Sequence, residues 1–396
     1  TAKPERLSPK TAKALYGKNI FSSVSRLERF AGCPFSFFAE YGLKAEERRL
    51  YQLNTPDLGS LFHEVLELFS NKLEQDSLPW TSLTKEETTA RIHAAVEDAA
   101  PRLGNRILLD SAANQYLIRR LKRISTRAAW TLVQHLQQGD FVPAGYEVGF
   151  GAHEALPPIV IRLQDGGSLI LNGKIDRVDL LDANGTRYVK IIDYKSGNKT
   201  FHFQDIYYGL QLQLLVYLDA YLKYYKKTGA SFKPGGVFYF RITDPTLALD
   251  EELSAEAIEK ILYEKMRMSG LLLQEDVLIH GLDHSLAKSR SSAIVPVGYT
   301  KKGDPTAASN LATEEQYAAI LDFVATRTQE IGDAMKAGII TPAPYRDGQR
   351  TPCSYCSYRS LCRHSYGEAP RWRKLKKIDK ADFWESITPK QPTETE

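Results

Sequence analysis

Apolar residues recur at the spacing of amphipathic helices over much of the chain. Between residues 58 and 73 they follow an i, i+3, i+4, i+7 pattern, which predicts one buried stripe along a single helix. That stripe consists of Leu58, Leu61, Phe62, Val65, Leu66, Phe69 and Leu73. Residues 85–138 predict further helices with a break near residues 101–104. Residues 206–227, 254–268 and 313–337 predict three more, the last ended by Gly338.

A strand pattern begins near Tyr146. Residues 169–181, 188–194 and 236–242 are short runs rich in β-branched, aliphatic and aromatic side chains, which predict strands. The first two runs are joined through Asp182-Ala183-Asn184-Gly185, a strong turn signal, so we expect an antiparallel hairpin. Outside these elements we expect a linker over residues 1–20, a helical insertion over 76–140 and a basic, then polar, tail over 367–396.

Composition and charge narrow the class of protein. The chain has 396 residues, 43% of them hydrophobic, which is ample for a sizeable core. It lacks any apolar run near 18 residues, so no membrane span is expected. The chain starts at Thr1 without a secretion signal, which predicts a cut inside a longer, cytoplasmic polypeptide.

The net charge of +4 is small, but basic residues gather in two stretches. The first, residues 111–127, holds Arg119, Arg120, Lys122, Arg123 and Arg127, and the second covers residues 371–380. Both stretches can neutralise phosphates, while a solvated helix face and a solvated tail explain them equally well.

Two segments carry acidic residues within apolar strands. They are Gly173-Lys174-Ile175-Asp176-Arg177-Val178-Asp179 and Ile191-Ile192-Asp193-Tyr194-Lys195-Ser196-Gly197. A buried carboxylate is costly unless a cation meets it, and a divalent metal ion would do so. If the loop is Asp182–Gly185, Asp176 opposes Ile191 and Asp193 is its diagonal neighbour, about 7–8 Å away. A shift of one residue in the pairing would place Asp193 on the other face of the sheet. The alternative to a metal site is an ordinary exposed strand end with surface Asp and Lys residues.

Four further residues complete this constellation. Lys195 lies two positions after Asp193, where a cation can orient a water molecule and stabilise developing negative charge. His63 is a candidate metal ligand, although a lone histidine on a helix flank is more often structural. Gln213 and Tyr217, with Gln211 nearby, are candidates to contact the lysine or a phosphate, or they form the polar edge of a core helix.

The chain has four cysteines with an unusual spacing. Cys353, Cys356 and Cys362 are clustered, and Cys33 stands alone near the other end. Clustered thiols in a chain without a secretion signal indicate a metal site, either zinc or a [4Fe–4S] cluster, with the spacing favouring iron–sulfur. Joining Cys33 to Cys362 would close a ring over most of the chain, worth on the order of 5–6 kcal/mol in a loop-closure model. We therefore expect a structural staple and not an electron carrier.

Taken together, these residues resemble the RecB-type branch of the PD-(D/E)XK nucleases. The resemblance is carried by His63 in Gly-x3-His, by Asp176, by Asp193-Tyr194-Lys195 and by the helix with Gln213 and Tyr217. The split cysteine set resembles the iron-staple nucleases of that branch. One departure is that Ile175, not proline, precedes Asp176.

The resemblance implies an α/β, restriction-endonuclease-like fold with a central mixed sheet flanked by helices. It implies a nuclease domain over residues 21–366, with a catalytic core at 145–245 and a cysteine cluster at 341–366. Mg²⁺ would be bound by His63, Asp176, Asp193 and the Tyr194 carbonyl, and Lys195 would position the attacking water. Cys33, Cys353, Cys356 and Cys362 would hold [4Fe–4S].

The same resemblance implies a function and partners. The substrate would be DNA, at double-strand ends and as single strands, and the partner would be a helicase–nuclease subunit of the AddA type. The process would be resection of double-strand breaks for recombination, with this chain cutting the 5′-terminated strand. Two other readings remain: a DNA-end clamp without catalysis and a zinc-stapled interaction module.

Overall fold

A computed structural model describes residues 5–46, 55–102, 112–247, 252–362, 364 and 372–388 of the chain. Within these residues a six-stranded mixed sheet runs in the order β2-β5-β6-β7-β8-β9. Its strands are β2 (Val142–Phe150), β5 (Gly173–Ala183), β6 (Thr186–Lys195), β7 (Phe232–Arg241), β8 (Ser269–Leu273) and β9 (Leu311–Ala312). β5 pairs antiparallel with β2 and β6, whereas β6 and β7 are parallel. The expected central mixed sheet is confirmed.

The β5–β6 hairpin has a tighter turn than expected. Ala183 pairs with Thr186, so the loop is only Asn184-Gly185, with φ of +52° and +74°. These angles suit a two-residue turn with both central residues in the left-handed region. The expected register was wrong by two residues, because Ile191 pairs with Val178 and not with Asp176. Since strand alternation has period two, a shift of two leaves the pattern of faces unchanged.

The expected strand over 169–181 is two strands in different sheets. Residues Ser168–Leu171 form β4, which lies between β1 (Asn19–Ser22) and β3 (Ile159–Arg162) in a three-stranded sheet. The main sheet begins again at Gly173. Periodicity missed this break because the apolar pattern continues across Asn172.

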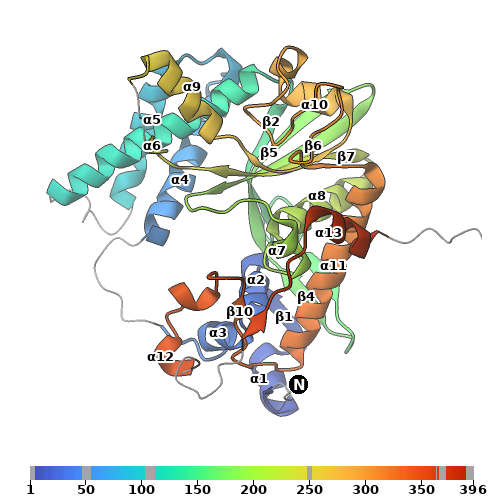
Figure 1. Cartoon of the computed structure of the whole chain (residues 1–396). Coiled ribbons are helices and arrows are strands. Elements are labelled where there is room, and N and C mark those ends of the chain that lie inside the picture. The colour runs from blue at the N-terminus through green and yellow to red at the C-terminus, as the bar shows by residue number, and fades with distance from the viewer. Residues whose placement is uncertain are drawn as a thin grey trace, which may run out of the picture.

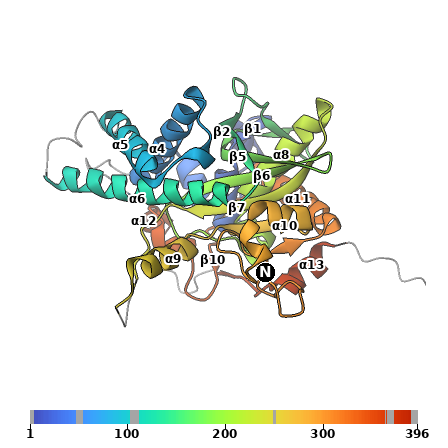
Figure 2. The same ribbon diagram turned by 90° about the horizontal axis from the view of Figure 1, so that it is seen from above.

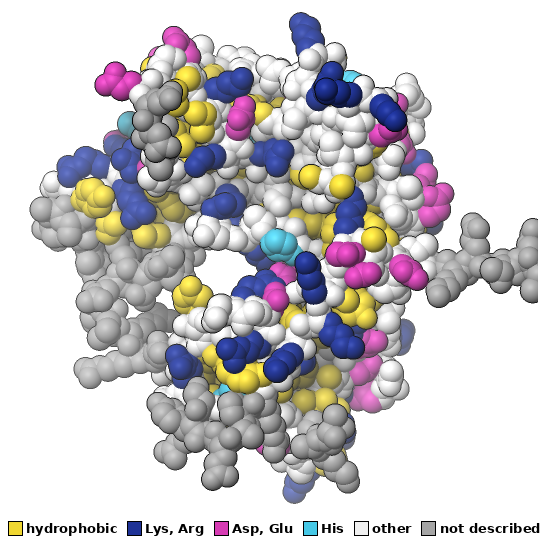
Figure 3. All heavy atoms as spheres, viewed as in Figure 1, with side chains coloured by type: hydrophobic (Ala, Val, Ile, Leu, Met, Phe, Trp, Pro, Cys, Tyr) yellow, Lys and Arg dark blue, Asp and Glu magenta, His cyan; other side chains and the backbone are white. Residues whose placement is uncertain are grey.

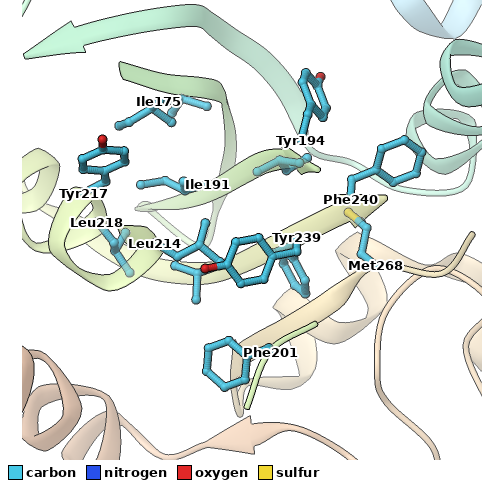
Figure 4. Packing of buried hydrophobic residues seen from close by; sticks show 14 of the residues in the cluster. Ile175, Ile191, Tyr194, Phe201, Leu214, Tyr217, Leu218, Tyr239, Phe240 and Met268 are labelled. Atoms are coloured by element: carbon cyan, nitrogen blue, oxygen red, sulfur yellow. The ribbon is translucent and has the colours of Figure 1, made fainter. Parts of the chain in front are cut away.

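Helices cover the main sheet on both sides, as Figures 1 and 2 show. In Figure 1, α8 (Gln213–Lys227) and α11 (Glu314–Lys336) lie below the sheet, and α10 (Asp276–Leu282) lies above it. The expected helix over 206–227 is interrupted: α7 (Phe203–Tyr207) ends before α8 begins. Figure 4 shows Leu214, Tyr217 and Leu218 of α8 directed towards the strands that carry Ile175 and Ile191. All five residues belong to one continuous hydrophobic core.

A helical layer packs beside the β2 edge of the sheet. It contains α4 (Thr55–Gln75), α5 (Lys85–Ala99) and α6 (Ala112–Gln137), with α9 (Ala255–Lys265) against α6 in Figure 1. α5 starts at a complete capping box formed by Thr84 and Glu87. The stripe predicted on α4 is buried from Leu61 to Leu73, and only its first residue, Leu58, is partly exposed. The helical insertion expected at 76–140 therefore forms a layer continuous with α4. No helix in the described ranges is long and apolar enough to cross a membrane.

Helices form within the segments that were predicted to be a linker and a tail. Residues 9–16, predicted to be linker, form α1 (Pro9–Tyr16), capped by Ser8 and followed by Gly17 at φ +67°. In the predicted tail, α13 (Lys380–Ile387) buries Phe383 and Trp384 against Phe203 of α7. Two aromatic side chains that bury against the core outweigh the polar composition around them. Residues 367–371 and 389–396 of that tail lie outside the described residues.

The remaining helices and short strands surround the cysteines. α2 (Val24–Gly32), α3 (Pro34–Phe37) and the π-helical turn Phe38–Gly42 form the N-terminal part, and α12 (Arg359–Cys362) lies beside α3 in Figure 1. β10 (Tyr345–Arg346) pairs in parallel with β11 (Arg373–Lys374). The Tyr358 hydroxyl donates to the Ala45 carbonyl at 2.9 Å, so the two ends of the chain contact each other directly.

Candidate active site

Asp176 and Asp193 meet where the hairpin ladder ends. The pairing of β5 with β6 stops at Arg177 and Ile192, and the two aspartates come next on their strands. The Asp176 carboxylate accepts a hydrogen bond of 2.6 Å from the backbone N–H of Tyr194. Burial, and then the negative charge of Asp176, raise the pKa of Asp193 to about 6. Two neighbouring buried carboxylates repel each other, so this point of the sheet attracts a cation.

Lys195 reaches Asp193 directly. Its Nζ lies 2.5 Å from Asp193 Oδ2 and 3.5 Å from Gln213 Oε1 at the start of α8. Burial works against the charged amine, but Asp193 outweighs it and the pKa of Lys195 is raised. The lysine therefore stays protonated at neutral pH.

His63 approaches the same point from α4. Its Nδ1 lies 3.4 Å from Asp176 Oδ2, and its ring meets Tyr194 edge-on at a centroid distance of 6.0 Å. Burial lowers the pKa of His63, but the hydrogen bond and charge of Asp176 outweigh it, and the net direction is up. Gly59, one turn earlier, packs closely against the residue after β6, since a Cβ there would lie 3.0 Å from Ser196 Oγ. The Gly-x3-His pattern thus lies where α4 meets the end of β6, and the histidine is a candidate ligand.

Tyr217 explains the glycine at the start of the β5 segment. A Cβ on Gly173 would lie 2.1 Å from the Tyr217 hydroxyl oxygen, so any other residue there would displace this ring. Burial raises the pKa of Tyr217, and Asp193 and Asp176 add to the rise. Tyr217 therefore lies near both carboxylates as a neutral hydroxyl.

Gln211 is a structural residue and not part of the site. Its Oε1 accepts from His202 N at 2.8 Å and its Nε2 donates to the Thr200 carbonyl at 2.7 Å. Glu28, which the sequence patterns did not single out, holds the start of α8 instead. It accepts from the backbone N–H groups of Leu212 and Gln213 at 2.7 and 3.0 Å. Its other oxygen lies 3.1 Å from Lys199 Nζ.

Glu147 on β2 is the second residue missed by sequence reasoning. The pairs Tyr146–Arg177 and Val148–Ile175 flank it, so the ladder sets Glu147 opposite Asp176. Its φ is +47°, in the left-handed region that costs a non-glycine residue about 1–2 kcal/mol. Burial, followed by the charges of Asp176 and Glu67, raises the pKa of Glu147 to about 7. The available signal was an acidic residue inside an otherwise apolar strand.

The residues present fit a divalent cation. One ligand atom each from His63, Glu147 and Asp176 lies within 4.8 Å of the other two. Carboxylate oxygens are the donors that Mg²⁺ and Mn²⁺ prefer, and a neutral imidazole nitrogen is a common metal ligand in proteins. Asp193 adjoins this group, although its Oδ2 is held by Lys195. A cleft of about 640 Å³ opens beside the group, lined by Gly59, Ser60, His63, Glu64, Glu67, Leu68, Glu147 and Ser196.

The fold places Cys33 near the cysteines of the C-terminal segment. All are free thiols, and Cys33 is buried at the junction of α2 and α3. Burial raises the pKa of Cys33 to about 11, and the neighbouring Cys353 and Cys356 oppose its ionisation further. Cys356 and Cys362 act in the same way on Cys353. Cys33 therefore lies near Cys353 and Cys356, and Cys353 lies near Cys362, which makes the four thiols candidate ligands of zinc or of an iron–sulfur cluster.

The first basic stretch lies on α6, and much of its charge is compensated. Arg119, Lys122, Arg123 and Arg127 line a pocket of about 420 Å³ with Trp130. Arg123 pairs with Asp244 at 2.5 Å and Lys122 with Glu97 at 2.6 Å. Figure 3 shows Lys and Arg side chains gathered at the left of the molecule, over the α6 end of this layer.

Comparison with known proteins identifies relatives over nearly the whole chain. The model of the PD-(D/E)XK nuclease superfamily matches residues 22–363. The chain is 43% identical over 379 residues to a subunit of the ATP-dependent helicase/deoxyribonuclease of Alkaliphilus oremlandii, covering 95% of this chain and 33% of the relative. The proteins of the same name from Alkaliphilus metalliredigens and Anoxybacillus flavithermus are 45% and 38% identical, over 89% and 95% of this chain and 30% and 33% of the relatives. The chain therefore spans about a third of the length of these curated relatives.

Proposed function

The chain belongs to the PD-(D/E)XK nuclease superfamily, and we propose on that basis that it hydrolyses DNA phosphodiester bonds with a bound divalent cation, Mg²⁺. The observation that carries the proposal is the convergence of His63, Asp176, Asp193 and Lys195 from one helix and two strands. A non-catalytic structural site has no need of two adjacent buried carboxylates, because they destabilise the fold when no cation is present.

Each side chain has a role that follows from its position. Asp176, Asp193, His63 and the Tyr194 carbonyl would hold the cation. When bound, Mg²⁺ supplies Lewis-acid polarisation of the phosphate and lowers the pKa of water. Lys195, kept protonated by Asp193, orients the attacking water and offsets negative charge that develops on the phosphate. Gln213 fixes the amine of Lys195 at 3.5 Å, and the Tyr217 hydroxyl can donate to a phosphate oxygen.

We further propose that Cys33, Cys353, Cys356 and Cys362 hold a [4Fe–4S] cluster that acts as a structural staple. The cluster would join α2 and α3 to the segment after α11 and so close most of the chain into a ring. A purified brown protein with absorbance near 400 nm supports iron–sulfur. A colourless protein that contains zinc contradicts it.

The relatives' names supply the wider proposal. Each is named as a subunit of an ATP-dependent helicase/deoxyribonuclease. We propose that this chain is the C-terminal nuclease domain of such a subunit, of the AddB type, with its core near residues 145–245. Its partner would be the AddA helicase–nuclease subunit. In the bacterial cytoplasm it would resect double-strand ends for recombination by cutting the 5′-terminated strand.

The decisive experiment is cleavage of end-labelled single-stranded DNA by the purified chain, with Mg²⁺ and with excess chelator. Asp193→Ala is expected to abolish cleavage while DNA binding and folding persist. Asp182→Ala is the matched control, because Asp182 lies at the far end of the same hairpin in an exposed pair with Arg187. Undiminished cleavage by Asp193→Ala refutes the proposal. DNA binding without metal-dependent cleavage by the wild type supports an end clamp instead.

A further inference from the structure

Glu147 lies beside the proposed metal residues, and its charge is poorly compensated. In the described residues its one ion-pair partner is Lys174, at 3.8 Å, and the Lys174 side chain is 52% exposed. The Glu147 side chain is only 17% exposed. A distant, solvated amine does little to compensate a carboxylate that is mostly buried. An ordinary surface ion pair therefore does not explain why the acid occupies this place.

The backbone around Glu147 shows that its side chain is directed and not incidental. The ladder between β2 and β5 continues on both sides of Glu147, with Tyr146 opposite Arg177 and Val148 opposite Ile175, and its register shifts only between Pro143 and Gly145. Between these pairs Glu147 adopts φ +47°. A strand residue in the left-handed region persists only where its surroundings over-determine it. The result is a Glu147 carboxylate oxygen within 4.8 Å of ligand atoms from both Asp176 and His63.

We propose that Glu147 is a further ligand of the divalent cation, which it binds together with His63 and Asp176. The inference rests on the proposed nuclease function and adds a carboxylate from β2 to a site otherwise built from α4, β5 and β6. With Asp193 paired to Lys195, this third carboxylate supplies negative charge that the lysine does not neutralise. It also places the cation at the wall of the cleft that Glu147 and His63 line.

The test measures binding of Mn²⁺ alone by the whole chain, using calorimetric titration after removal of free divalent ions. Glu147→Gln preserves size and removes the charge, and it should weaken Mn²⁺ binding at least about tenfold. Glu147→Asp keeps the charge but withdraws the carboxylate by one methylene, and it should also weaken binding. Metal-free Glu147→Gln should unfold at a higher temperature than metal-free wild type, because one repelling charge has gone.

The matched control is Glu67→Gln, because Glu67 lines the same cleft and lies close enough to Glu147 to disfavour its ionisation, but is not one of the three converging residues. Removing the Glu67 charge should change the Mn²⁺ affinity less than about threefold, because water and salt screen a charge that does not contact the ion. Equal losses in Glu67→Gln and Glu147→Gln, or wild-type affinity in Glu147→Gln, overturn the inference. So does the absence of saturable Mn²⁺ binding in the wild type. Saturable wild-type binding without DNA cleavage refutes the nuclease proposal and leaves the ligand assignment standing.

Discussion

The buried cluster behind the active site offers the sharpest test of what stabilises this fold. Asp179 on β5 is fully buried and accepts hydrogen bonds from Arg177 Nε at 2.6 Å and Nη2 at 3.0 Å. Lys190 Nζ on β6 lies 2.9 Å from the same carboxylate. Two cations, 1% and 5% exposed, therefore depend on one anion. Although burial acts to raise it, the pKa of Asp179 is lowered by Arg177 and Lys190, so the group is ionised at neutral pH.

The perturbation is Asp179→Asn, which keeps the shape and removes the charge. It leaves both Arg177 and Lys190 in the core without their counter-ion, and Arg177 keeps its contact with the Trp80 ring, 4.7 Å from the ring centroid. Removing one partner of a buried ion pair costs about 3–5 kcal/mol, because the remaining charge stays desolvated. We expect the free energy of unfolding to fall by that amount, a large part of the stability of an ordinary domain.

Three residues further along β5, the same strand supplies the control. Asp182 accepts from Arg187 Nε at 2.6 Å and Nη2 at 2.9 Å, nearly the same geometry, but its side chain is 65% exposed. Water solvates both partners there, so Asp182→Asn should change stability only slightly. Urea unfolding followed by circular dichroism, at matched metal content, measures both variants. Equal losses in the two variants would show that burial does not set the value of this ion pair.

Three further predictions each concern a single residue. Gly173→Ala forces the Tyr217 hydroxyl to move by about 1.3 Å to restore a 3.4 Å contact, and a displacement of that size should lower DNA cleavage roughly 100-fold. If this loss acts through Tyr217, adding Tyr217→Phe to Gly173→Ala should lower cleavage little further. Additive losses in the double-mutant cycle contradict this explanation. Burial, followed by the charges of Lys190 and Arg177, lowers the pKa of His135 to about 3. Below about pH 6.5 His135 is therefore protonated in the unfolded chain but stays neutral in the folded chain. This group should therefore lower the free energy of unfolding by up to about 1.4 kcal/mol per pH unit as the pH falls from about 6.5 to 3. His135→Phe should reduce the dependence of the free energy of unfolding on pH, measured by urea titrations at several pH values. An unchanged pH dependence contradicts the assignment. Cys33→Ser should remove absorbance near 400 nm and lower the midpoint of thermal unfolding together, and a variant that loses the absorbance but keeps wild-type stability refutes the staple.

Residues whose role follows from the local sequence pattern could be predicted. The helix stripe from Leu61 to Leu73 follows from helical periodicity, and the hairpin follows from Asn184-Gly185 between two apolar runs. The family resemblance rested on short segments with fixed spacing, each of which carries its own chemistry. The α1 helix was missed although Ser8, Pro9 and Gly17 are recognisable cap residues, because the short polar segment has no strong apolar stripe.

Residues whose role depends on distant segments could not be predicted in the same way. Glu28 is recognisable only once α2 lies beside the start of α8, and Glu147 only once β2 pairs with β5. The exact pairing of the hairpin also needed the structure, because registers that differ by two residues put the same side chains on the same faces and periodicity does not separate them.

The order of residues alone establishes which chemistries this protein holds: two carboxylates and a lysine near one hairpin, a histidine on an amphipathic helix, and four thiols split between the chain ends. Folding establishes which of these groups share a site, how deeply each is buried, and that a third carboxylate faces Asp176. This division arises because composition and local periodicity depend on neighbours in the chain. Desolvation and charge–charge interactions depend on distances in space, and only long-range packing of α4, β2, β5 and β6 sets those distances.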